Sequence, residues 1–155
     1  MTIDVGSTIV QIGRGPTGTA LARQLLPSLP PGSRYVVIDR DPAATHLPFG
    51  TPERTHLINT RAAKTSLNLA DPDEFERWLT EQATAAGESA AEFPARFWFG
   101  RYVRDMFDQA VKEATAAGVT VDVVTDEEDA VITAIAERWR EDCASGRADE
   151  AGRVV

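Results

Sequence analysis

The sequence has a single cysteine, Cys143, and only two histidines in 155 residues. One cysteine excludes an internal disulfide, and no histidine pattern near it indicates a nucleophile. Such sparse cysteine fits a reducing compartment, so we expect a cytoplasmic protein. His46 and His56 stand in a polar stretch without cysteine or acidic ligands at metal spacing, so no metal site is predicted.

The sequence also lacks a basic excess and a long apolar run. It has 16 lysines and arginines against 24 acidic residues, for a net charge of −8. Nucleic acids and anionic membrane surfaces require clustered basic residues, and the arginines here are scattered. No stretch approaches the roughly 20 apolar residues that span a bilayer, and residues 1–12 show no signal-peptide pattern. We therefore expect neither a nucleic acid nor a membrane as a partner.

What the sequence does contain is enough apolar side chains, 43% of the total, for about one packed domain. Residues 8–13, "TIVQIG", predict a short buried strand that ends at glycine. Residues 16–26 predict a helix with a proline at its first position, and residues 34–39, "RYVVID", predict a second strand. Together these segments have the length and order of one right-handed βαβ unit.

The stretch "GRGPTG" between the first strand and the helix has two interpretations. It is either a dinucleotide-binding turn or only a tight connection. In a dinucleotide site, Gly13 permits the turn, Gly15 lets a pyrophosphate approach the backbone, and Gly18 lets the helix pack on the strand. The helix N-terminus then presents free N–H groups to the phosphates. Because a strand precedes the turn and a helix follows it, the dinucleotide interpretation is favoured.

Charged residues accompany this turn. Asp39 ends the second strand, where a carboxylate accepts hydrogen bonds from ribose hydroxyls, although its spacing from the first glycine slightly exceeds the usual roughly 20 residues. Arg14 either reaches a phosphate or points to solvent, and the sequence leaves both open. The predicted cofactor contacts in this part of the chain are Gly13, Arg14, Gly15, Pro16, Thr17, Gly18, Asp39 and Arg40.

The remaining sequence predicts a helical insertion. Residues 40–68 lack periodicity and are expected to form a long loop. A helix is predicted from Asp71, as its N-cap, to Gly87, and another over residues 99–118, followed by a strand over 119–124. We therefore expect an α/β, Rossmann-like domain over residues 1–125, with a short parallel sheet and an insertion at about 70–117. Residues 126–155 form an acidic C-terminal segment that fits either a helix or a strand.

Four stretches in this order resemble a known family. They are "IGRGPTGTALARQLL" with "VVIDRDP", "HLINTRAAKTSL", "DPDEFERWL" and "FPARFWFGRYVRDMF". The sequence is similar to the N-terminal part of FAD/NAD(P)-binding proteins related to class B flavin monooxygenases and N-hydroxylases. The first stretch is common to many nucleotide-binding folds, whereas the other three are more specific.

The resemblance implies an FAD site. The glycine turn would take the FAD pyrophosphate and Asp39 the adenosine ribose. Asn59 and Ser66 would lie near the flavin, and a segment that shapes the cofactor cleft would include Arg96, Gly100, Arg101 and Tyr102. The alternatives are that Asn59 is a turn residue and Arg96 a structural ion-pair partner. Phe75 and Trp78 are expected in the core.

The resemblance also sets the functional expectation. It implies an FAD-binding oxidoreductase or monooxygenase-type domain, with NAD(P)H as a further cofactor whose site is not evident in this chain. Members of the family are several times longer and carry a second glycine motif, so we expect a fragment, a split subunit or a pared-down relative. A sheet with an unpaired edge favours a homo- or hetero-oligomer. The alternatives are a non-catalytic binding or assembly protein and a cofactor-free enzyme on a degenerate flavoprotein domain.

Overall fold

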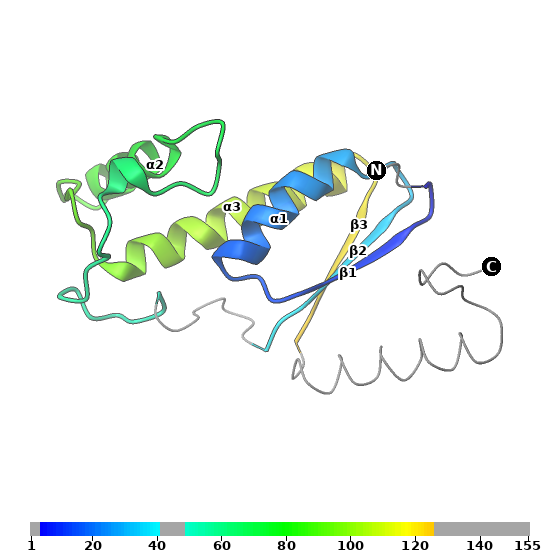
Figure 1. Cartoon of the computed structure of the whole chain (residues 1–155), viewed down its shortest axis with the longest axis horizontal. Helices are drawn as coiled ribbons and strands as arrows, with labels where there is room; N and C mark the ends of the chain where they lie inside the picture. The colour runs from blue at the N-terminus through cyan, green and yellow to red at the C-terminus, as the bar shows by residue number, and fades with distance from the viewer. Residues whose placement is uncertain (1–3, 41–48, 126–155) are drawn as a thin grey trace.

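The computed structural model, which describes residues 4–40 and 49–125, has an α/β architecture built on a parallel sheet (Figure 1). Three strands lie in the order β1-β2-β3 and pair in parallel along their whole length. The strands are β1 (Thr8–Ile12), β2 (Arg34–Ile38) and β3 (Thr120–Val124). This confirms the predicted Rossmann-like fold with a short parallel sheet.

Two helices cover one face of the sheet. They are α1 (Pro16–Leu25), extended by a 3₁₀ turn η1 (Leu26–Ser28), and the second half of α3 (Arg96–Ala116). In the strand register Ile9, Tyr35 and Val121 are partners, and all three pack into the core beneath these helices. Because α1 and α3, the helices between successive strands, both lie on this face, the two connections have the same rotational sense, which is what the handedness rule for parallel strands predicts.

The opposite face of the sheet is more open. Its residues alternate with those of the covered face, because successive side chains of a strand point to opposite sides. Val10, Ile12 and Val124 on this face are 40–44% exposed, whereas Ile38 in the central strand is 5% exposed. The central strand is therefore the best covered, and the outer two strands leave apolar side chains partly in solvent.

The helical insertion lies beyond the carboxyl end of the sheet. It contains a 3₁₀ turn η2 (Ala62–Lys64), helix α2 (Glu74–Ala85) and the first half of α3. In Figure 1, α2 lies beside the start of α3 and away from the strands. Buried aromatic residues fill this part of the molecule, among them Phe75, Trp78, Trp98, Phe99 and Tyr102.

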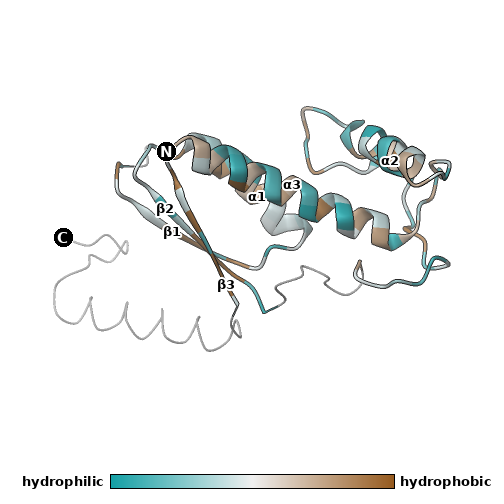
Figure 2. Ribbon diagram, turned by 180° about the vertical axis from the view of Figure 1, so that it is seen from behind, coloured by the Kyte–Doolittle hydropathy of each residue, from teal (hydrophilic) through white to brown (hydrophobic). Residues whose placement is uncertain are grey.

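Helix α3 joins the two cores. Its buried residues up to Met106 belong to the aromatic core, and those from Phe107 onward pack beneath α1 and against the sheet. Figure 2 shows bands of hydrophobic and hydrophilic residues along its length, as expected for a helix with one buried face. We call residues 49–95 with α3 up to Met106 the insertion, and the strands, α1 and the rest of α3 the sheet region.

Helix boundaries differ from the prediction at two places. The predicted N-cap Asp71 lies before the helix, which begins at Glu74, because the Asp71 carboxylate pairs with Arg77 and the chain makes a turn first. The next helix begins at Arg96, three residues before the predicted start at Phe99. No capping side chain marks that start, since an alanine occupies the N-cap position.

The predicted C-terminal segment, 126–155, lies outside the described residues, as does Cys143. Within residues 4–40 and 49–125, no helix is long and apolar enough to cross a membrane.

Candidate functional site

The glycine turn follows β1 directly and leads into α1. Gly13 has φ +81°, a conformation that side chains other than glycine rarely adopt. Its amide still donates to the carbonyl of Ile38 (2.8 Å), so the turn begins while the chain remains attached to β2. This conformation is the one that a tight turn at Gly13 needs, and a contact of Gly13 with a cofactor stays a prediction.

Gly18 sets how closely α1 approaches the end of β1. A Cβ atom at Gly18 would lie 2.2 Å from the carbonyl oxygen of Gly13 and 2.8 Å from Nε2 of Gln11. Real Cβ atoms do not tolerate such distances, so any side chain would push the helix away. The close packing that the sequence predicted for this glycine is therefore present.

Gly15 precedes Pro16 at the N-cap position of α1. Its backbone (φ −63°, ψ −170°) is extended and open to any residue, so conformation does not require glycine here. Its carbonyl accepts the hydrogen bond from the Thr19 amide (2.8 Å), while the first-turn amides of a helix have no intrahelical partner. A missing side chain beside free amides suits an anion that approaches the backbone.

Asp39 links the end of β2 to the turn. Its Oδ2 accepts a hydrogen bond from the Arg14 amide (2.7 Å), and the residue is fully buried. The carboxylate therefore holds the turn in place. Its predicted contact with a ribose stays a prediction. Arg40 follows in a bend and is exposed.

The Arg14 side chain takes a path that the sequence left undecided. Its guanidinium carbon lies 5.8 Å from the centre of the Phe107 ring of α3. The side chain is partly buried, so it does not simply extend into solvent. Arg14 thus places its guanidinium over the Phe107 ring of α3, in a cation–π arrangement.

Three polar residues that the sequence analysis missed support the turn from within. Gln11 is 5% exposed; its Nε2 donates to the Gly13 carbonyl (2.7 Å), and its Oε1 accepts from the Tyr35 hydroxyl. The Thr19 hydroxyl donates to the Arg14 carbonyl (3.1 Å). Burial raises the pKa of Tyr35 to about 12. The available signal was a glutamine inside an apolar strand, two residues before the first glycine.

The residues expected near the flavin lie in the insertion. Asn59 is exposed, and Ser66 donates to the carbonyls of Asn68 (3.1 Å) and Asp71 (2.9 Å) within a local turn. Arg96 donates through Nε to the Leu57 carbonyl (3.1 Å). These hydrogen bonds organise the insertion. Roles of Asn59, Ser66 and Arg96 in cofactor binding stay predictions.

Tyr102 is fully buried and connects the insertion to α1. Its hydroxyl donates to Glu74, and that carboxylate also binds Arg23 of α1 through two hydrogen bonds of 2.6 and 2.7 Å. Burial alone would raise the pKa of the Glu74 carboxyl, but the hydrogen bonds from Arg23 and Tyr102 outweigh it and lower that pKa. The hydroxyl of Tyr102 thus serves a structural network, and its predicted contact with a cofactor stays a prediction.

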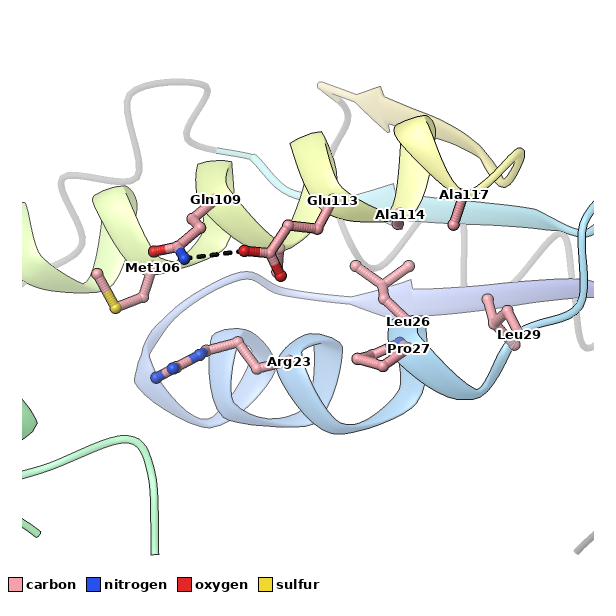
Figure 3. Close-up of a pocket in the computed structure, with 10 residues that line it drawn as sticks. Arg23, Leu26, Pro27, Leu29, Met106, Gln109, Glu113, Ala114 and Ala117 are labelled. Carbon is pink, nitrogen blue, oxygen red and sulfur yellow. Dashed lines mark hydrogen bonds between the residues drawn. The ribbon is translucent and has the colours of Figure 1, made fainter. Parts of the chain in front are cut away.

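A separate groove of about 320 Å³ lies between α1 and α3 (Figure 3). Leu26, Pro27 and Leu29 face Ala114 and Ala117 across it, and Gln109 donates to Glu113 (2.9 Å) on its rim. The Arg23 guanidinium is already held by Glu74. The groove therefore combines apolar and polar side chains, but these do not form a set of groups arranged for acid–base or nucleophilic chemistry. Among the described residues, no cluster of three or more His, Cys, Asp or Glu could hold a metal ion.

The turn and its supports have the geometry that a dinucleotide site requires. A pyrophosphate needs close approach to the backbone and partial positive charge. The turn fits both needs through its left-handed glycine, a helix packed against the end of its strand, and free amides at the helix start. The fold and this site define a dinucleotide-binding domain of the Rossmann type. The model of the FAD-NAD(P)-binding family matches residues 10–155, and the chain belongs to that family. Comparisons with curated proteins and with solved structures gave no match.

Proposed function

We propose that the chain forms the FAD-binding domain of an oxidoreductase of the monooxygenase type. The observation that carries this proposal is the glycine turn, where Gly15 leaves the backbone accessible beside the first amides of α1. Family membership supports a flavin or nicotinamide dinucleotide. FAD is our choice because three of the stretches behind the resemblance, including "DPDEFERWL", lie outside the general nucleotide motif.

In this proposal, bound FAD supplies the redox chemistry, and the protein binds and orients it. Gly13, Gly15 and Gly18 shape the pyrophosphate position, and the α1 N-terminus offsets the phosphate charge. Asp39 fixes the turn through the Arg14 amide, so the binding geometry exists before a ligand arrives. Preorganisation of this kind reduces the entropy lost on binding.

Residues 1–125 are proposed as the nucleotide-binding unit, acting with a partner chain or a further domain. Both outer strands of the described sheet have an unpaired edge. An unpaired edge is suited to pairing with another chain. NAD(P)H, if used, would then bind largely outside the described glycine turn.

One observation favours a non-catalytic alternative. The Asp39 carboxylate is fully buried and already hydrogen-bonded to the turn, so less of it is available to a ribose. A binding or assembly protein that has kept the fold without the cofactor would show the same contact. The two proposals differ in whether the purified chain binds a dinucleotide.

The test is titration of FAD, NADH and NADPH against the wild type and Gly15→Val. We expect the wild type to bind FAD and the variant to bind at least about tenfold more weakly, because the valine side chain occupies the phosphate position. Stability in urea should change little, since the extended backbone at Gly15 accepts valine. Ala85→Val, at an exposed position of α2, adds the same kind of side chain and should leave binding unchanged.

Failure of the wild type to bind any of the three dinucleotides at millimolar concentration would refute the proposal and favour the non-catalytic alternative. Equal binding by Gly15→Val and the wild type would place the ligand somewhere other than the glycine turn.

A further inference from the structure

A second cavity, of about 330 Å³, lies between the first turns of α3 and residues 49–54. This volume lies within the range of small-molecule sites. The α3 side is formed by residues spaced three or four apart, which share one helix face: Phe97, Gly100, Arg101 and Arg104. A Cβ atom at Gly100 would lie 2.5 Å from the Phe49 carbonyl oxygen. Glycine therefore keeps the two walls close.

The lining of this cavity is positively charged. It includes Arg54, Arg101 and Arg104, and none of the described residues that line it is acidic. Arg54 pairs with Glu88 (2.9 Å). The Arg101 guanidinium lies 5.0 Å from the centre of the Trp98 ring, and in the described part of the chain it has no carboxylate partner. In a chain of net charge −8, the Arg101 guanidinium attracts anions to this cavity.

The cavity also offers apolar surface. Phe49 and Phe97 stand on its two walls, one from the loop segment and one from α3. Aromatic side chains provide flat apolar contacts for a ring. A guanidinium beside them is suited to a phosphate or carboxylate, which it binds through two parallel hydrogen bonds. The combined lining therefore selects an anionic group attached to a flat ring.

The cavity lies along α3, on the N-terminal side of the contact between Phe107 and Arg14. Arg104 lies one helical turn before Phe107, whose ring is 5.8 Å from the Arg14 guanidinium carbon. Because α3 rises about 1.5 Å per residue, the cavity extends from roughly 5 to 15 Å along the helix from that contact. This separation allows the cavity to hold either another part of the ligand at the turn or a separate ligand beside it.

We propose that this arginine-lined cavity is a second anion-binding subsite, which takes a phosphate or carboxylate carried on a flat ring, with Arg101 as its anion-binding residue. Arg101 suits this role because its side chain is exposed and already oriented by the Trp98 ring. The proposal needs no pyrophosphate at the glycine turn, so it stands or fails separately from the proposed function.

The experiment compares FMN with riboflavin, which carries the same ring without the phosphate. The full chain is titrated as wild type, as Arg101→Gln and as Lys112→Gln, which removes a positive charge from an exposed position on the same helix. We expect the wild type to bind FMN more tightly than riboflavin. Arg101→Gln should weaken FMN binding about five- to tenfold and leave riboflavin unchanged. Lys112→Gln should match the wild type.

Competition then identifies the source of the anion. If FAD displaces FMN, the subsite holds part of the dinucleotide; if both bind together, it serves a separate ligand, and either result supports the subsite. Equal affinities of the wild type for FMN and riboflavin, or equal FMN binding by Arg101→Gln and the wild type, would overturn the proposal. Gly15→Val distinguishes the glycine turn from the arginine-lined cavity. If this variant loses FAD binding but keeps FMN binding that depends on Arg101, the two sites have different roles.

Discussion

The sheet region and the insertion are stabilised in different ways. The sheet region has a mainly aliphatic core on one side of three strands, and it leaves the turn at the carboxyl end of β1 accessible. The insertion has a core of stacked and edge-to-face aromatic rings. The glycine turn therefore lies at the edge of one core, while a separate core supports the insertion, where the residues predicted near the flavin lie.

The aromatic core should account for the largest single stability effect. Phe75 is fully buried and contacts the rings of Trp78, Phe99 and Tyr102. Phe75→Ala should lower the free energy of unfolding by about 3–5 kcal/mol, because it removes buried area and leaves a cavity. Urea denaturation followed by tryptophan fluorescence measures this change.

Phe93, 40% exposed, provides the control, since Phe93→Ala should have a much smaller effect. If both substitutions cost the same, the aromatic cluster is not the main support of the insertion, and the contrast between the two regions is lost.

Glu74 tests how the two regions are joined. It accepts hydrogen bonds from Arg23 of α1 and Tyr102 of α3, and its side chain is only 16% exposed. Glu74→Gln should destabilise the protein by about 1–3 kcal/mol. This loss lies between the stability losses typical of exposed ion pairs and of fully buried ion pairs. Glu92→Gln, in an ion pair with Arg61 whose partners are 62% and 63% exposed, should have no measurable effect.

The Glu74 network also predicts a pH dependence. Because folding lowers the pKa of Glu74 from its ordinary value of 4.5, its stabilisation is present above about that pH and is lost as the pH falls further. The unfolding free energies of the wild type and Glu74→Gln should therefore converge as the pH falls from 7 to 3. A difference that stays constant over this range would contradict the charged network.

The smallest expected effect lies beneath the glycine turn. Tyr35→Phe removes the hydroxyl that donates to Gln11 and leaves the buried amide oxygen without that donor. The cost should be about 1–2 kcal/mol. Because burial raises the pKa of Tyr35 to about 12, its hydroxyl stabilises the fold below pH 10 and loses this effect between pH 10 and 12.

Chemical denaturation of Tyr35→Phe at pH 8 and at pH 11 gives the comparison. The difference in unfolding free energy between Tyr35→Phe and the wild type should be smaller at pH 11 than at pH 8. If it is the same at both, burial does not raise the pKa of the Tyr35 hydroxyl above its value in the unfolded chain.

The sequence by itself determined the βαβ unit, the third strand and the glycine turn. These features depend on local properties: β-branched strands, a proline at a helix start, and glycines at positions such as Gly13, where φ is +81°. Periodicity also placed Phe75 and Trp78 correctly in the core. Helix starts were harder to predict from the sequence, because the N-cap residue of α3 is Ala95, which has no capping side chain.

Only the tertiary structure decided which side chains meet. Gln11 pairs with Tyr35 across 24 positions, and Glu74 reaches Arg23 across 51. Arg14 lies over Phe107, and Arg101 lines a cavity whose other wall is about 50 residues away in the sequence. Local patterns fix backbone conformation and the buried face of each element, but contacts of this range depend on how the helices pack on the sheet, because packing selects one partner among many residues of similar chemistry.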